Sequence, residues 1–190
     1  MKRTLIVVAL IAALIAPIWA QDSGTTPDGF EWNVPYPNAT NKVIWIEGYT
    51  GTGGAVRIPE RINNIPVVEI VPDVFTGDTR ITSVVIPNTV TKIWSQAFMN
   101  CVNLTSVTLG TGLTEIGAQA FSGCTKLTSI SLPASITTIG NNAFSGCTAL
   151  TTVTIPSSVT RITFGTNVFL RVTNLNAVTV QALTNRGYKF

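Results

Sequence analysis

Histidine is absent from this chain, so the side chains that could carry chemistry are three cysteines and a small set of carboxylates. Without histidine, the serine–histidine and cysteine–histidine forms of nucleophilic catalysis are excluded, and so is the commonest metal ligand. Cys101, Cys124 and Cys147 follow one another at intervals of 23 residues, which is not the spacing of a zinc motif. If the three stack at about 5 Å, distance alone would allow a disulfide between two of them, but the odd number in the row and its flanking residues Asp78 and Val172 favour three buried thiols.

The carboxylates do not form a pair suited to hydrolysis. Glu69 and Asp73 are the only acidic residues close together in the repeated region, and Glu115 is the only acid in its three regular copies. Residues 21–190 carry ten basic and nine acidic side chains, and the bases form no run that would indicate a nucleic-acid or anionic-membrane surface. The sequence therefore predicts no catalytic, metal or cofactor site, and a carboxylate-based hydrolase ranks last among three functional hypotheses.

The elements that position these residues come from one pattern of 23 residues. The pattern occurs four times, and the fourth copy is two residues longer than the others: Ile81–Asn103, Leu104–Lys126, Leu127–Ala149 and Leu150–Asn174. A fixed period of this length is typical of a solenoid, because a single copy cannot bury its own apolar residues and stacked copies can.

Each copy predicts a short strand followed by a tight turn. In the second copy Val107 and Leu109 alternate with polar residues, which indicates a strand with one buried face. Proline or glycine three residues after the position of Val107 ends the strand, since proline cannot donate to a strand ladder. The run before each phenylalanine fits a single helical turn. The phenylalanines expected to form one buried row are Phe75, Phe98, Phe121 and Phe144.

The repeated unit is L-T-x-V-x-I-P-x-x-V-T-x-I-G-x-x-A-F-x-G-C-x-x. Over roughly residues 48–180 it resembles the BspA-like, or Treponema pallidum type, leucine-rich repeat of bacterial surface proteins. The resemblance implies a leucine-rich-repeat solenoid with a parallel β-sheet on one face and short helical turns or loops on the other. It also implies a secreted or surface-exposed protein associated with adhesion. Because the repeat is a scaffold that carries many specificities, it does not identify a ligand.

The chain divides into five segments. Met1–Ala20 is predicted to be a secretory signal peptide, because two basic residues precede a short apolar run that ends in a small residue. The remaining segments are a flexible linker (21–29), an N-terminal β-hairpin cap with its turn (30–52), the repeat solenoid (53–180) and a C-terminal tail (181–190).

Three irregularities interrupt the repeat. Glu60–Pro66 delays the pattern by five residues and is expected to bulge out as a loop. Phe164-Gly165-Thr166 is expected to hold the two extra residues of the last copy. Leu175–Val180 resembles the strand of a further coil that the tail does not complete, which predicts an exposed edge at that end.

The candidate binding surface consists of side chains expected to point outward. The strand positions are Ser83, Val85, Ser106, Thr108, Ser129, Ser131, Thr152 and Thr154, and a second outward row is Lys92, Glu115, Thr138 and Arg161. Lys92 and Glu115 are expected to form an exposed cross-strand pair. Trp94 stands where other copies have glycine, so it either protrudes as an interface anchor or folds over the 60–66 loop.

These observations predict a non-enzymatic binding or adhesion module that is secreted, periplasmic or on the cell surface. Its expected partner is an extracellular protein or another cell-surface macromolecule, with no nucleic acid and no membrane span in the mature chain. The alternative is a structural unit that self-associates through an uncapped C-terminal repeat.

Overall fold

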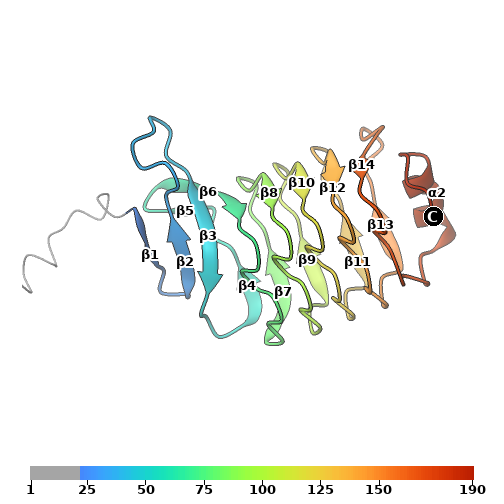
Figure 1. The fold of residues 1–190 in the computed structure, drawn as a ribbon, viewed down its shortest axis with the longest axis horizontal. Coiled ribbons are helices and arrows are strands. Elements are labelled where there is room, and N and C mark those ends of the chain that lie inside the picture. The colour runs from blue at the N-terminus through green and yellow to red at the C-terminus, as the bar shows by residue number, and fades with distance from the viewer. Residues whose placement is uncertain (1–21) are drawn as a thin grey trace, which may run out of the picture.

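The computed structural model describes residues 22–190, and these form a solenoid whose strands lie side by side along one long axis (Figure 1). The chain advances along this axis from the N-terminal to the C-terminal end. Parallel pairing between successive coils confirms the predicted solenoid. The predicted signal peptide lies outside the described residues. Within residues 22–190 no helix is long and apolar enough to cross a membrane.

Three antiparallel strands close the N-terminal end: β1 (Ser23–Thr25), β2 (Phe30–Asn33) and β3 (Ile44–Tyr49). β2 and β3 form the predicted hairpin, and the side chains of Phe30 and Trp32 are buried in the common core. Within the predicted flexible linker, Ser23–Thr25 forms β1 instead, which pairs along the edge of β2. Gly24 lies against the indole of Trp32, where an added Cβ would be only 3.2 Å away. Polar composition was misleading here, since an edge strand can form without an apolar face of its own.

One series of parallel strands follows the predicted alternation: β4 (Gly54–Arg57), β7 (Ile81–Val85), β9 (Ser106–Thr108), β11 (Ser129–Ser131) and β13 (Thr152–Thr154). β4, β7 and β9 form one ladder, and β11 pairs with β13 in another. The central side chains of the last three strands, Val107, Ile130 and Val153, are buried. Proline stands two residues after the end of β7, β11 and β13, as predicted.

A second series of strands forms a separate sheet that the sequence did not predict: β3, β6 (Ile65–Ile70), β8 (Lys92–Ile93), β10 (Glu115–Ile116), β12 (Thr138–Ile139) and β14 (Thr163–Phe164). Most of these strands have two residues, too few to show an alternation. Glycine follows three of them because the coils approach closely. A Cβ added at Gly117, Gly140 or Gly165 would lie 2.4–2.6 Å from the backbone of the preceding coil.

Five phenylalanine rings stack through the core: Phe75, Phe98, Phe121, Phe144 and Phe169. Neighbouring ring centroids are 4.7, 5.2, 5.5 and 5.6 Å apart, and the ring planes lie within 6° of one another. The predicted row of four is confirmed, and Phe169 extends it by one coil. The residues before each ring form tight turns in place of a helical turn. Left-handed residues reverse the chain on both sides of a ring, such as Gln119 (φ 57°) before Phe121 and Gly123 (φ 74°) after it.

The interruption at 60–66 is a β-hairpin and not the expected loop. β5 (Arg61–Ile62) pairs antiparallel with the start of β6, and Asn63 and Asn64 form the turn with φ of 50° and 63°. Positive φ at both central residues is the geometry of the two-residue turn that suits a right-handed strand twist, and asparagine tolerates it. The Arg61 guanidinium also donates to the carbonyl oxygen of Asn64 across the turn, at 2.9 Å.

The two extra residues of the last copy are also placed differently from the prediction. Phe164 pairs with Ile139, and Gly165 packs against the preceding coil, so these two residues keep the register of the repeat. The extra length therefore lies before β14, in Thr160–Ile162. The glycine contact explains this placement, because Gly165 has no room to shift toward the coil beneath it.

A helix closes the C-terminal end where a further strand was expected. α2 (Ala177–Thr184) begins at Asn176, whose side chain accepts a hydrogen bond from the Thr179 backbone N–H. Thr179 and Leu183 are buried against the last coil, and the Thr179 hydroxyl accepts from the N–H of Val153. The predicted strand over Leu175–Val180 and the uncapped end are therefore wrong. Asparagine at an N-cap position was the local signal for a helix here.

Candidate interaction surface

The predicted outward strand positions form a continuous face of small hydroxyl side chains. Ser83 pairs in register with Ser106 on the next strand, and Ser129 pairs with Thr152. Ser106, Thr108, Ser129, Ser131 and Thr154 are exposed, and Ser83, Val85 and Thr152 are half-buried. None of these positions on β7, β9, β11 and β13 carries a charge, and Val85 is the apolar residue among them.

The second outward row brings together a compact polar cluster around Trp94. The Trp94 indole N–H donates to the Glu69 carboxylate at 2.7 Å, and the Lys92 ammonium lies 3.7 Å from the centroid of the indole ring. Lys92 also forms the predicted pair with Glu115, at 3.1 Å. Trp94 is half-buried, and its indole lies against Lys92 and Glu69. Its polar groups are satisfied within the chain, and we assign the cluster a structural role.

Arg161 does not belong to this row. Thr163 is the residue that pairs with Thr138, so the two extra residues move Arg161 out of register. Arg161 is exposed near the C-terminal end. The sequence-predicted surface is therefore divided among the hydroxyl face, the Trp94 cluster and this single arginine.

Many of the remaining threonines that face solvent serve the stacking of the coils. The hydroxyls of Thr91, Thr114 and Thr137 each donate to a carbonyl oxygen of the preceding coil, at 3.0–3.3 Å. Thr105 and Thr151 do the same beside the first strand series. This ladder of hydroxyl bonds accounts for part of the threonine content without a ligand.

A groove lies beside the inserted β5–β6 hairpin, and the sequence did not predict it. Its volume is about 380 Å³, and its lining includes Val85, Pro87 and Leu109 as the apolar part and Arg57 and Glu60 as the charged part. Arg57 and Glu60 are both exposed, and Val85 and Leu109 are half-buried. The available signal was the delay in the repeat at Glu60–Pro66, since insertions in repeat proteins gather on the face that binds partners.

The cysteines are not arranged for catalysis. Cys101, Cys124 and Cys147 are free and buried, in agreement with the interpretation favoured from the sequence. Each thiol donates to a carbonyl oxygen of the phenylalanine row, at 3.1–3.2 Å. Burial raises the pKa of the Cys101 and Cys147 thiols to about 12, and it raises the pKa of Cys124 in the same direction. Neutral buried thiols are poor nucleophiles and poor metal ligands.

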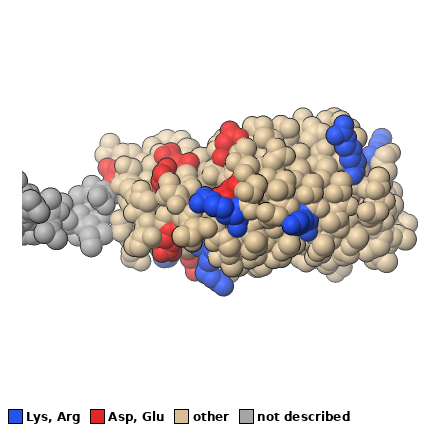
Figure 2. Space-filling view, turned by 90° about the horizontal axis from the view of Figure 1, so that it is seen from below, with Lys and Arg blue, Asp and Glu red and all other residues tan. Residues whose placement is uncertain are grey.

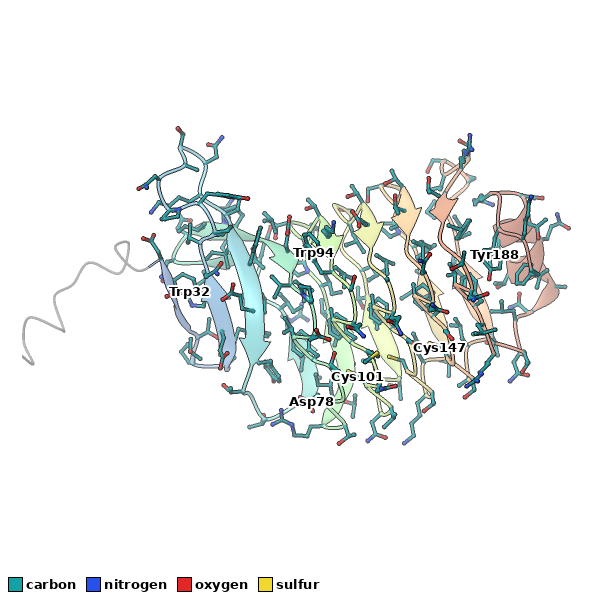
Figure 3. The ribbon with its side chains drawn as sticks, viewed as in Figure 1. Trp32, Asp78, Trp94, Cys101, Cys147 and Tyr188 are labelled. Carbon is teal, nitrogen blue, oxygen red and sulfur yellow. The ribbon has the colours of Figure 1, made fainter. Side chains whose placement is uncertain are left out.

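Among residues 22–190 no group of three or more cysteine, aspartate or glutamate side chains could hold a metal ion. Asp78 occupies the position that cysteine takes in the next three coils, and its carboxylate binds the Arg80 guanidinium at 2.7 Å (Figure 3). The hydrogen bond from Arg80 holds the pKa of Asp78 below its ordinary value. Arg80 also donates to the carbonyl oxygen of Gly51, so this pair ties the turn before β4 to the coil.

The stacked parallel coils and the buried phenylalanine row define a leucine-rich-repeat solenoid. The family profile described as "BspA type Leucine rich repeat region" matches residues 68–188 in six copies. The chain belongs to this family. No curated protein matches the chain significantly.

Solved structures agree with this assignment. The leucine-rich-repeat protein of T. pallidum is 25% identical, with a TM-score of 0.53, and the match covers 87% of this chain and 97% of that chain. A leucine-rich-repeat protein from Bacteroides capillosus is also 25% identical, with a TM-score of 0.61, over 72% of this chain and 100% of that one. A leucine-rich cell surface protein from Faecalibacterium prausnitzii is 28% identical, with a TM-score of 0.56, over 81% of this chain and 53% of that one.

Proposed function

We propose that this chain is a secreted or cell-surface protein-recognition module that serves adhesion, and that the groove beside the β5–β6 hairpin is its main contact site. Membership in a family of leucine-rich-repeat surface proteins favours protein–protein recognition. The observation that carries the choice of site is the groove itself, a concave surface next to Glu60, where the inserted hairpin begins and the chain departs from the repeat.

The chemistry of the groove suits a polypeptide segment. Val85, Pro87 and Leu109 offer an apolar floor for one or two side chains of a partner. Arg57 and Glu60 form no salt bridge with each other, so each can pair with a charge on the partner. Such a combination of an apolar centre and a charged rim is common in protein interfaces.

A capture experiment with matched variants tests the proposal. Residues 21–190 are immobilised and exposed to extracellular matrix and neighbouring-cell extracts, and the captured proteins are quantified. Val85→Lys should reduce capture about tenfold or more, because it places a charge on the apolar floor. Thr154→Lys is the control, since Thr154 has the equivalent outward position on β13 at the far end of the hydroxyl face. Equal capture by the two variants would exclude the groove as the contact site.

Export is part of the same proposal, and protein sequencing tests it. The predicted signal peptide ends at Ala20, so the exported protein should begin at Gln21. Exported protein that retains Met1 would contradict this prediction. Self-association through an uncapped repeat does not fit this structure, because α2 covers the last coil.

A further inference from the structure

The charges of this solenoid are separated along its long axis. Residues 22–115 carry nine acidic and five basic side chains, a net charge of −4, whereas residues 116–190 carry five basic and no acidic side chains, a net charge of +5. Because the chain advances steadily along the axis, separation in sequence is separation in space. Figure 2 shows this on one face, where the acidic side chains occupy the N-terminal part and only basic ones lie toward the C-terminal end.

Residues 22–115 are called the acidic part below, and residues 116–190 the cationic part. The cationic part also exposes apolar side chains. Leu170, Val178 and Phe190 are 46%, 79% and 65% exposed, and all three belong to the last coil or the C-terminal cap. The groove against the outer side of α2 includes Val178 and Ala182 among its lining residues. At the other end the N-terminal cap exposes Tyr36, which is 65% exposed. Both ends therefore combine a net charge, negative at one end and positive at the other, with exposed apolar surface.

Arg171 gives a second reason to assign a role to the cationic part. It has φ of 62°, at the turn position where Gly77, Gly123 and Gly146 also have positive φ. Arginine in this conformation is strained, whereas glycine is not, so repeat stability alone would favour glycine there. The side chain of Arg171 is exposed, and it is the residue directly after the exposed Leu170.

We propose that two copies of this chain associate side by side and antiparallel, with the acidic part of each against the cationic part of the other. The described residues have a net charge of only +1, so two copies do not repel each other overall. An antiparallel pair satisfies both complementary contacts in one closed, two-fold dimer, whereas end-to-end stacking satisfies one contact per junction and remains open. This arrangement is independent of the proposed groove, and it places the end with Tyr36 at the same level as the end with Val178 and Phe190.

Sedimentation equilibrium of residues 21–190 at two salt concentrations tests the dimer. Charges interact over roughly 30 Å at 0.01 M salt but only about 8 Å at 0.15 M, where salt screens them more strongly. Dimerisation should therefore be at least about tenfold weaker at the higher salt concentration. The test variant reverses three charges in each part: Asp28→Lys, Glu31→Lys and Glu60→Lys, together with Arg161→Glu, Arg171→Glu and Lys189→Glu. These positions are exposed, and the net charge of the chain stays the same.

The test variant should be monomeric at both salt concentrations, because the net charges of its two parts change from −4 and +5 to only +2 and −1, which leaves little attraction between them. The matched control, Arg57→Glu with Glu60→Arg, exchanges two charges within the acidic part and should dimerise like the original chain. A monomeric original chain at low salt, or equal dimerisation of the test variant, would overturn the proposal. Species larger than a dimer would indicate end-to-end stacking and overturn the antiparallel arrangement. A monomer that binds poly-L-glutamate would assign the cationic part to another acidic polypeptide.

Discussion

The stacked phenylalanine row should dominate the stability of the solenoid, and Phe121→Ala measures its contribution. Phe121 is fully buried, and its ring centroid lies 5.2 Å from that of Phe98 and 5.5 Å from that of Phe144. Truncating a buried phenylalanine costs roughly 3–5 kcal/mol, and the cost is largest where the surroundings cannot collapse into the cavity. Coils on both sides of Phe121 hold its space open, so we expect a value in the upper part of this range.

Phe121→Leu separates ring stacking from burial. Leucine keeps most of the apolar volume but loses two aromatic contacts, each contributing about 0.5–1.5 kcal/mol beyond burial. The free energy of unfolding should therefore fall by roughly 1–3 kcal/mol, clearly less than for the alanine variant.

Urea unfolding followed by far-UV circular dichroism measures both effects. Val178→Ala is the control, since Val178 is 79% exposed, and its effect should stay within about 0.5 kcal/mol. A loss below about 1 kcal/mol for Phe121→Ala would refute the view that the row holds the coils together.

Three further predictions concern the last coil and the cysteines. Tyr188 is buried against Phe164 and Phe169, so Tyr188→Ala should lower the free energy of unfolding by about 3 kcal/mol in urea, and an effect as small as that of Val178→Ala would contradict the cap. Arg171→Gly should raise the free energy of unfolding in urea by up to about 1 kcal/mol, because glycine adopts the positive φ without strain. A lower free energy of unfolding would mean that the Arg171 side chain stabilises the fold. The buried thiols have pKa values raised from the ordinary 9.0 to about 12 in Cys101 and Cys147, so their contribution to stability is complete below pH 9 and falls as the pH rises toward 12. Urea midpoints measured from about pH 8 to about pH 11 should decrease, and Cys124→Ala should flatten the decrease; a constant midpoint for the original chain would contradict the burial of the thiols.

The repeat period determined the parts of the fold that recur. Once residues 23 apart are placed one above another, the phenylalanine row, the cysteine row and the strands around Val107, Ile130 and Val153 follow from apolar spacing. The pairing of Lys92 with Glu115 also follows, because the two residues occupy the same position in adjacent copies. These features were predictable because every coil meets the same packing requirement.

Only the tertiary structure determined the conformation of the segments that interrupt the repeat. The Glu60–Pro66 segment forms a hairpin because two asparagines adopt positive φ, and the groove beside it exists only after β4, β7 and β9 are aligned. In the last coil the close contact at Gly165 moves the extra residues ahead of β14.

The two ends follow the same rule. The sequence contains an asparagine at position 176 and a polar run before Phe30, but neither feature requires a particular neighbour, and a strand was predicted over Leu175–Val180. Leu183 and Thr179 form a helix there because the last coil offers them a buried face, and β1 forms because β2 has an unpaired edge. For residues within the repeat, the period identifies which residues pack against one another. Residues at the two ends have no such period, and their packing partners are set only when the solenoid has folded.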